Sequence, residues 1–317
     1  MKTKDIIIRV TCILLIVLTI AFIKPISNKV VGLLYHNPKI VVPKSNQYAR
    51  NYNFKYISKT TTFRPYNYQE LLNIYYTVLD NGWDEFTFYC PSEYTNCLED
   101  IQALSNDQLI LSYINNFVSP FNCFKNIYTS YDETGLITIK VTKLYSNEEI
   151  AFINDALNNI IKNNINNTDT DEEKIKKLHD YIINNTRYDE AANKINEITD
   201  ASTAYGLLKN HLATCNGYSD TMALLLDRLH IKNYKIAIAP NNTKTGHVWN
   251  AIYLNNEWLH LDLTWDDPIS TDGKDYLYHK YFLVDNDGLA DADQGEVNID
   301  SHNFKDSIYL EYKNKSK

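Results

Sequence analysis

The clearest hydrophobic pattern along the chain lies in its C-terminal half. After Cys215, apolar residues recur at helical spacing as far as His230, which predicts a helix with Cys215 at or just before its first turn. Three short stretches after this helix are predicted to be strands. The predicted strands are residues 234–239, 247–254 and 257–265. We therefore expect a helix packed on an antiparallel sheet.

The connection between the last two of these strands allows their register to be predicted. Asn255-Asn256 suits a two-residue type I′ turn. Such a turn places Trp249 opposite Asp262, so that His247 and Asp262 share one face as diagonal neighbours, with Cα atoms about 7–8 Å apart or less. A slip of one residue would put them on opposite faces. Two titratable groups are thus expected side by side on a buried hairpin.

Shorter patterns fill residues 48–145 and predict a small α+β domain. Tyr52, Phe54 and Tyr56 alternate with polar residues, as in a half-buried strand. Other expected elements are helices over 68–79, 98–104 and 107–114, a strand over 85–90, and a hairpin of 126–131 and 136–143. The chain has 25 tyrosines, and we expect them to serve core and edge packing rather than ligand binding.

Capping signals predict the helices between this region and Cys215. Ser146 with Glu149, and Thr170 with Glu173, have the spacing of capping boxes and open helices that end near residues 162 and 186. A further helix is expected over 200–212. These helices belong to the same predicted domain as Cys215.

The N-terminus carries an apolar run, Ile6 to Ile23, between basic residues. A cleavable signal peptide is one interpretation, but no small-residue cleavage site follows Ile23. We favour an uncleaved signal anchor with the bulk of the chain outside the cell. The expected organisation is a cytoplasmic tip and transmembrane anchor, a linker, a small α+β domain, a catalytic domain and a C-terminal extension, at residues 1–24, 25–47, 48–145, 146–290 and 291–317.

Composition narrows the possible partners. The 317 residues have a net charge of −8 and show no basic stripe, so nucleic acid is an unexpected partner. The five cysteines include no pair with zinc-site spacing, and we expect neither metal nor cofactor. Cys90 and Cys97 are placed either to form a disulfide or to be small buried residues, and Cys215 is the expected free thiol.

Cys215, His247 and Asp262 supply the groups of a nucleophilic acyl-transfer site. A thiol needs a base to deprotonate it and a third group to orient that base. A helix start favours the thiolate, and the Cys215 backbone N–H could also stabilise an oxyanion. Tyr205 is the candidate for a side-chain oxyanion donor. The chemistry would be attack on a carboxamide or peptide carbonyl to give a thioester.

Each of these residues also has an ordinary structural interpretation. A cysteine at a helix start is usually structural, a histidine beside tryptophan usually belongs to the core, and an aspartate at a strand end is often a cap. The predicted placement of His247 beside Asp262 favours catalysis for the set. His260 shares that face but lies closer to the turn and is the weaker base candidate. No equivalent partner is seen in the sequence for His179, His211, His230 and His279.

Several segments, in this order, resemble the bacterial transglutaminase-like superfamily. They are Thr203–Leu208, Thr214–Asp220, Leu225–Ile231, Gly246–Ala251, Trp258–Pro268 and Tyr281–Val284. The resemblance spans residues 171–285 and implies an α+β, papain-like core, with Cys215 as nucleophile, His247 as base and Asp262 as its orienting partner. Asn216 departs from the Gln or Glu that such proteins often carry, which bears on substrate preference.

The resulting expectation is a membrane-anchored, cell-surface cysteine acyl-transfer enzyme acting on protein or cell-wall peptides, with Trp249 and Trp265 as candidate substrate-binding residues. Hydrolysis is favoured over transamidation because nothing in the sequence marks a site for an amine. The alternative is a surface binding or scaffold protein whose transglutaminase-like domain is inactive.

Overall fold

The computed structural model describes residues 40–132, 134–192, 198–239, 246–269, 276–294 and 302–312. Val42–Lys317 form one compact unit. The apolar run predicted as a membrane anchor lies outside the described residues, as does most of the predicted linker. Within the part of the chain that is described, no helix combines the length and apolar character needed to cross a membrane.

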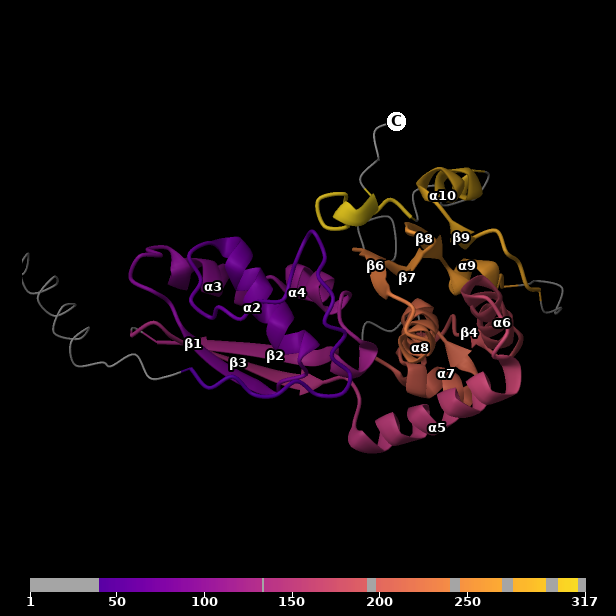
Figure 1. The fold of residues 1–317 in the computed structure, drawn as a ribbon, viewed down its shortest axis with the longest axis horizontal. Helices are drawn as coiled ribbons and strands as arrows, with labels where there is room; N and C mark the ends of the chain where they lie inside the picture. The colour runs from indigo at the N-terminus through magenta and orange to yellow at the C-terminus, as the bar shows by residue number, and fades with distance from the viewer. Residues whose placement is uncertain are drawn as a thin grey trace, which may run out of the picture. The chain divides into compact units, whose positions relative to one another are not determined.

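The N-terminal part of the compact unit contains an antiparallel sheet in the order β1-β3-β2, with helices along one of its faces (Figure 1). Its elements are α2 (Tyr68–Asp80), β1 (Glu85–Tyr89), α3 (Cys97–Asn106), α4 (Gln108–Asn115), η1 (Pro120–Asn122), β2 (Phe124–Tyr131) and β3 (Leu136–Lys143). Ile137 and Ile139 on β3 are fully buried on the covered face. The predicted helices and the hairpin are confirmed, with bounds shifted by one or two residues.

The predicted strand at Tyr52–Tyr56 is wrong. The chain bends at Lys55 and Tyr56, the Phe54 N–H donates to the Ile57 carbonyl, and residues 52–56 form no strand. The Phe54 ring packs against Phe117 and Tyr234, with centroids 4.9 and 5.2 Å away. The aromatic alternation here reflects packing of rings into a core rather than strand pleating.

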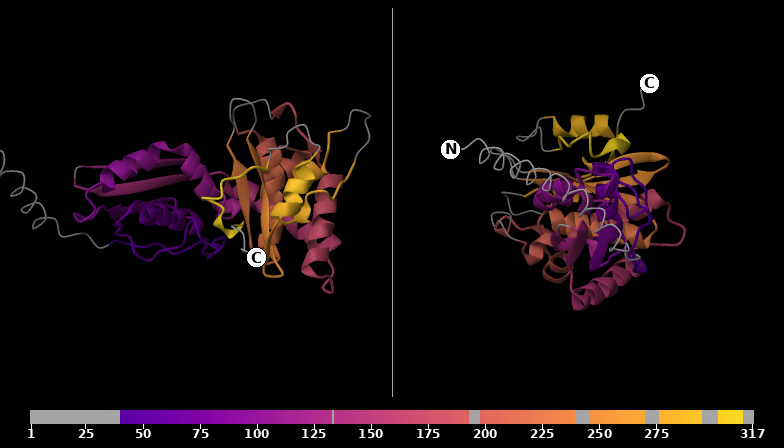
Figure 2. Two further views of the ribbon diagram at one scale, coloured as in Figure 1. Left: turned by 90° about the horizontal axis from the view of Figure 1, so that it is seen from above. Right: turned by 90° about the vertical axis from the view of Figure 1, so that its left-hand side faces the viewer.

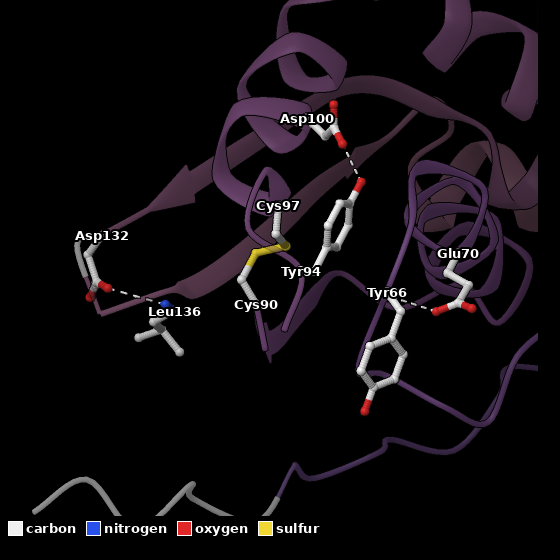
Figure 3. The surroundings of a disulfide bond; sticks show 8 residues. All are labelled: Tyr66, Glu70, Cys90, Tyr94, Cys97, Asp100, Asp132 and Leu136. Carbon is white, nitrogen blue, oxygen red and sulfur yellow. Dashed lines mark hydrogen bonds between the residues drawn. A yellow bond between two sulfur atoms is a disulfide. The ribbon is translucent and has the colours of Figure 1, made fainter. Parts of the chain in front are cut away.

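Cys90 and Cys97 form a disulfide, which settles the question that the sequence left open (Figure 3). The bond joins the end of β1 to the first residue of α3. The nearby β2–β3 hairpin is closed by the Asp132 carboxylate, which accepts a hydrogen bond from the Leu136 N–H at 3.2 Å. Gly135 adopts a φ of 82°, a conformation that side chains disfavour.

The remaining chain builds helices around a second antiparallel sheet, in the order β6-β7-β8-β9 (Figure 2). The elements are α5 (Asn147–Asn164), α6 (Asp171–Asn184), β4 (Arg187–Tyr188), η3 (Asp200–Ser202), α7 (Ala204–Asn210), β5 (Leu212–Ala213), α8 (Cys215–Arg228), β6 (Asn233–Ile238), β7 (His247–Leu254), β8 (Glu257–Leu261), α9 (Leu263–Asp266), β9 (Phe282–Val284), α10 (Asn286–Asp293) and η4 (Leu310–Tyr312). Both capping boxes are present, at Ser146 and Thr170.

The register predicted for the β7–β8 hairpin is confirmed. Leu254 pairs with Glu257 and Asn250 pairs with Leu261. Asn255 and Asn256 have φ values of 51° and 67°, the two positive values that a type I′ turn requires.

Two predicted boundaries are wrong, and both errors have the same cause. The strand predicted to run to residue 265 ends at Leu261, because the Asp262 side chain caps the short helix α9. The helix predicted from residue 200 begins at Ala204, where Thr203 caps it and accepts a hydrogen bond from the Gly206 N–H. In each case a cap side chain outweighs the hydrophobic pattern.

The C-terminal residues pack into the same unit. The Tyr309 hydroxyl accepts a hydrogen bond from the Ala237 N–H at 2.8 Å and another from the Asn116 side chain at 3.2 Å. Tyr312 stacks on His260 with ring centroids 4.2 Å apart. Tyrosine therefore links the sheet, the N-terminal helices and the chain end, in keeping with the predicted packing role.

Candidate active site

Cys215 is the first residue of α8, as the hydrophobic pattern predicts. Thr214 before it is extended, with φ −94° and ψ 177°. Gly217 lets this turn approach its neighbours, since a Cβ there would lie 2.6 Å from the Ala201 carbonyl oxygen. The Cys215 N–H has no acceptor within its own helix, and the positive end of the helix dipole lies at the thiol. Cys215 itself is buried, with 8% of its surface exposed.

Buried polar contacts hold α8 against the sheet that carries His247. The Asn250 side chain on β7 donates to the Ser219 carbonyl at 2.9 Å. Lys235 on β6 pairs with Asp220 at 2.5 Å, and the Tyr145 hydroxyl donates to the same carboxylate at 2.7 Å. Because a buried ion pair depends on good geometry, these contacts fix the helix in one position. The thiol and the imidazole are thereby mounted on elements that do not move freely.

His247 and Asp262 are brought together as the register predicted. His247 Nε2 lies 2.5 Å from Asp262 Oδ2. The other oxygen, Oδ1, accepts hydrogen bonds from the Thr264 and Trp265 N–H groups at 2.9 and 3.2 Å. Asp262 is therefore both a helix cap and a partner for histidine, so the structural and functional interpretations apply to different oxygens of one carboxylate.

The surroundings of His247 favour its charged form. Burial lowers the pKa of His247, but the charge of Asp262 and hydrogen bonds with Asp262 and Cys215 outweigh burial and raise that pKa to about 10. Burial acts to raise the pKa of Asp262, yet its interactions with His247 and His302 hold that pKa below its ordinary value. At neutral pH the pair is thus an imidazolium and a carboxylate. The hydrogen bond with Cys215 places the thiol beside the imidazolium.

His302 is a neighbour of Asp262 that the sequence did not indicate. His302 Nε2 lies 2.9 Å from Asp262 Oδ2, and its Nδ1 lies 2.7 Å from Asp293 Oδ1. The residue is 4% exposed. It lies in the segment expected to be a C-terminal extension, 40 positions from Asp262, and no local spacing connects the two.

Tyr188 is a second residue that sequence reasoning missed. Tyr188 on β4 pairs with Ala213 on β5. Ala213 lies two residues before Cys215 in the sequence. Burial raises the pKa of Tyr188 well above its ordinary value, and the charges of Cys215 and Asp262 raise it further. A protonated hydroxyl is thus held near the thiol.

The other candidates from the sequence lie around this group in different ways. Trp249 is 1% exposed, stacks on His247 with centroids 5.6 Å apart, and donates its indole N–H to His260 at 3.0 Å. Trp265 is half-buried and its ring lies 6.2 Å from that of His247. The hydroxyl of Tyr205 accepts a hydrogen bond from Lys209 at 2.6 Å. Their predicted roles with substrate stay predictions.

His260 has the environment of a structural residue. It is fully buried and its Nε2 lies 2.9 Å from the Asn286 side chain. Burial lowers the pKa of His260 to about 4, so the ring is neutral at pH 7. This agrees with its prediction as the weaker base candidate.

Among the described residues, two histidine–aspartate groups have the ligand types that metals bind. One is His247, Asp262 and His302, and the other is His179, Asp180 and His279, and within each group the ligand atoms lie within 4.8 Å of one another. In the second group His279 Nε2 lies 2.6 Å from Asp180 Oδ1, and the Lys176 ammonium lies 3.0 Å from the same nitrogen. A cation held beside that nitrogen disfavours a metal there. In the first group, His247 Nε2 and His302 Nε2 both lie at hydrogen-bonding distance from Asp262 Oδ2.

Comparison with known proteins relates this part of the chain to a known family. Residues 159–263 match the model of the transglutaminase-like superfamily. A kyphoscoliosis peptidase of Mus musculus is 22% identical over 165 residues, which are 46% of this chain and 24% of that protein. The chain therefore spans about a quarter of the length of this curated relative.

Two solved structures also resemble part of the chain. One is the crystal structure of a TGase, with a TM-score of 0.34 and 18% identity over 48% of each chain. The other is a protein from Cytophaga hutchinsonii described as a cysteine protease, with a TM-score of 0.29 and 14% identity over 44% of this chain and 61% of that one. Residues 159–263 carry Cys215, His247 and Asp262, and by the match of the family model this segment is a transglutaminase-like domain.

Proposed function

We propose that this protein is a cysteine acyl-transfer enzyme, a peptidase or transglutaminase, with Cys215 as nucleophile, His247 as acid and base, and Asp262 as the group that orients His247. The observation that carries the proposal is the Asp262–His247 hydrogen bond of 2.5 Å beside a thiol at a helix start. Structural histidines and cysteines are common, but a thiol hydrogen-bonded to an imidazole that a carboxylate orients is the arrangement that activates a nucleophile.

The reaction would proceed in two steps. The Cys215 thiolate attacks a carboxamide or peptide carbonyl, the S–C bond forms, and the C–N bond breaks as His247 gives its proton to the leaving amine. Water then transfers a proton to His247 and attacks the thioester, the S–C bond breaks, and the acid is released with Cys215 returned to its thiolate beside the His247 imidazolium. The negative oxygen would be stabilised by the Cys215 N–H and by the Tyr188 hydroxyl, which replaces Tyr205 as our candidate donor.

We further propose that the enzyme acts outside the cell on protein or cell-wall peptides, anchored by its N-terminal apolar run. The Cys90–Cys97 disulfide supports an oxidising compartment. Hydrolysis is the proposed outcome, with transamidation as the alternative that an amine acceptor would allow. An inactive binding or scaffold role is the competing function, and it predicts an unreactive Cys215.

A labelling experiment tests the proposal. Iodoacetamide should alkylate Cys215 much faster than Cys123, which is 1% exposed and whose pKa burial raises to about 11. Peptide mapping by mass spectrometry reports both thiols in the same sample. We expect His247→Ala to slow Cys215 labelling at least tenfold and leave Cys123 unchanged. Labelling of Cys215 that is no faster than labelling of Cys123, and that is indifferent to His247→Ala, would favour the inactive scaffold.

The outcome of the reaction needs a second assay. A glutamine-containing peptide with an amine probe distinguishes three products by mass: the cleaved peptide, the deamidated peptide and the peptide joined to the probe. Cys215→Ala is the control, since it removes the nucleophile and should abolish all three. If the assay yields the probe-linked peptide and neither the cleaved nor the deamidated peptide, the preference for hydrolysis is wrong.

A further inference from the structure

His302 is held between two carboxylates. Its Nε2 lies 2.9 Å from Asp262 Oδ2 and its Nδ1 lies 2.7 Å from Asp293 Oδ1. The ring is enclosed by Trp249, Trp265 and Tyr281, whose ring centroids lie 4.9, 5.1 and 4.9 Å away. His302 is therefore part of a buried series of hydrogen-bonded side chains. The series runs from Asp293 through His302 and Asp262 to His247.

The two contacts determine the protonation of His302. A carboxylate only accepts hydrogen bonds when it is ionised, so each ring nitrogen that faces one has to donate. A histidine that donates from both nitrogens is an imidazolium. Burial lowers the pKa of His302, but the contacts with Asp262 and Asp293 outweigh it and raise the pKa. His302 thus carries a positive charge against Asp262.

That charge acts on the same oxygen that His247 uses. Asp262 Oδ2 receives hydrogen bonds from both His247 and His302. His247 and His302 each donate to one lone pair of Oδ2. The two hydrogen bonds together hold the carboxylate in the orientation that faces His247. The positive charge of His302 also competes for the negative charge of Asp262, which weakens the pull of Asp262 on the His247 proton. A general acid that holds its proton less tightly gives it up more readily to a leaving amine.

We propose that His302, charged through Asp293, is a positioning residue that orients the Asp262 carboxylate and weakens its hold on the His247 proton. This inference rests on the proposed function, since it assigns His247 the task of moving a proton. It adds to the predicted Cys215–His247–Asp262 set an outer pair from the C-terminal segment.

The other titratable groups around this chain do not replace His302 in that role. The Tyr281 hydroxyl can donate to Asp293 Oδ1, the oxygen that His302 faces, or to the Ala292 carbonyl, each at 3.2 Å. His260 is neutral at pH 7 and its nitrogens face Trp249 and Asn286. Tyr188 responds to the charges of Cys215 and Asp262 but stays protonated. His302 is thus the cation, besides His247, that the described residues place against Asp262.

The test measures the His247 titration directly, by NMR of histidine-labelled protein in a Cys215→Ala background. This readout needs no activity, so the inference can fail or hold separately from the proposed function. His302→Gln removes the charge and keeps a hydrogen-bond donor, and we expect it to raise the pKa of His247 by about one unit or more. His279→Gln is the matched control, a histidine that also faces a carboxylate, and it should leave His247 unchanged.

Asp293→Asn gives an independent arm if His302→Gln folds poorly. It leaves His302 in place but removes one of the two charges that keep it protonated, so the pKa of His247 should again rise. In the enzyme with Cys215 intact, His302→Gln should lower kcat about tenfold to a hundredfold with little change in KM.

Three results would overturn the inference. The first is a His247 pKa that stays the same or falls in both variants. The second is an NMR spectrum at pH 7 in which only one nitrogen of His302 carries a proton. The third is one equivalent of bound Zn²⁺ that His302→Gln abolishes, since Asp262 Oδ2 would then be a metal ligand rather than a shared proton acceptor.

Discussion

The part of the chain that the structure describes contains two clusters of the same composition, each with two histidines around one aspartate. In the first, His247 and His302 contact Asp262. In the second, His179 and His279 contact Asp180 at 2.9 and 2.6 Å. The geometry of the individual contacts is similar, so a histidine–aspartate pair does not by itself identify a site. What surrounds each pair has to decide.

The clusters differ in burial and in the charge that completes them. Asp262 and His302 are almost fully buried, and a thiol at a helix start completes that group. The side chain of His279 is 36% exposed, and the second cluster is completed by Lys176, 2.6 Å from Asp180. Burial acts to raise the pKa of Asp180, but contacts with Lys176, His179 and His279 outweigh it and lower that pKa to about 2. The first cluster adjoins the Cys215 thiol, while the second combines the buried His179 with the more exposed Asp180, His279 and Lys176.

The largest difference should appear when one histidine is removed from each cluster. We expect His247→Asn to lower the turnover of a peptide substrate about a thousandfold or more, because both the base and the acid are lost. His279→Asn should change it less than about threefold. The measurement is kcat/KM for one substrate with both purified variants. Equal losses would mean that the second cluster contributes to the reaction, and the comparison would fail.

The second prediction uses pH on the first cluster. His247 has a pKa of about 10 in the folded chain against 6.5 for an unperturbed histidine. A pKa raised by folding stabilises the fold below pH 6.5, and that contribution is lost as the pH rises through about 10. The rate should decline over the same alkaline range, because the leaving amine takes its proton from the His247 imidazolium. A rate profile that declines near pH 7 instead would contradict the ion-pair assignment.

The third prediction separates stability from reactivity. Asp266 is fully buried, its Oδ2 lies 3.2 Å from His179 Nε2, and its Oδ1 accepts from the Tyr281 N–H at 3.0 Å. Asp266→Ala leaves the His179 imidazole and the Tyr281 N–H without this acceptor. The substitution should lower the free energy of unfolding by about 2–4 kcal/mol. Urea unfolding measures the loss, with Asp171→Ala, an exposed carboxylate in the first turn of α6, as control.

The labelling rate of Cys215 per folded molecule should stay near that of the wild type in Asp266→Ala. A collapse of labelling without a matching loss of stability would mean that Asp266 belongs to the reactive group.

The first cluster was partly predictable because its core depends on local chemistry. The Asn255-Asn256 turn determines the register of β7 and β8, and the register brings His247 beside Asp262. The start of α8 at Cys215 follows from periodicity and holds in the structure. Signals of this kind act over a few residues, so one sequence is enough to interpret them.

His302 and Tyr188, which surround the same cluster, were not predictable because their contacts join residues that are far apart in the sequence. His302 contacts Asp262 from 40 residues away, and Tyr188 is brought close to Cys215 by pairing with Ala213 in the β4–β5 ladder. Neither contact leaves a spacing in the sequence. The strand predicted at Tyr52–Tyr56 failed similarly, because ring packing between distant segments produced the alternation that strands also show.

The smallest effect should come from the exposed cation of the second cluster. The Lys176 side chain is 49% exposed, and exposed ion pairs contribute little because water and salt screen them. Lys176→Ala should lower the free energy of unfolding by less than about 1 kcal/mol, and most of that difference should vanish in about 1 M salt. Urea unfolding at low and high salt measures it, with Lys174→Ala on the same helix as control. A loss of several kcal/mol that resists salt would show that the second cluster is held as rigidly as the first, and burial would no longer distinguish the two.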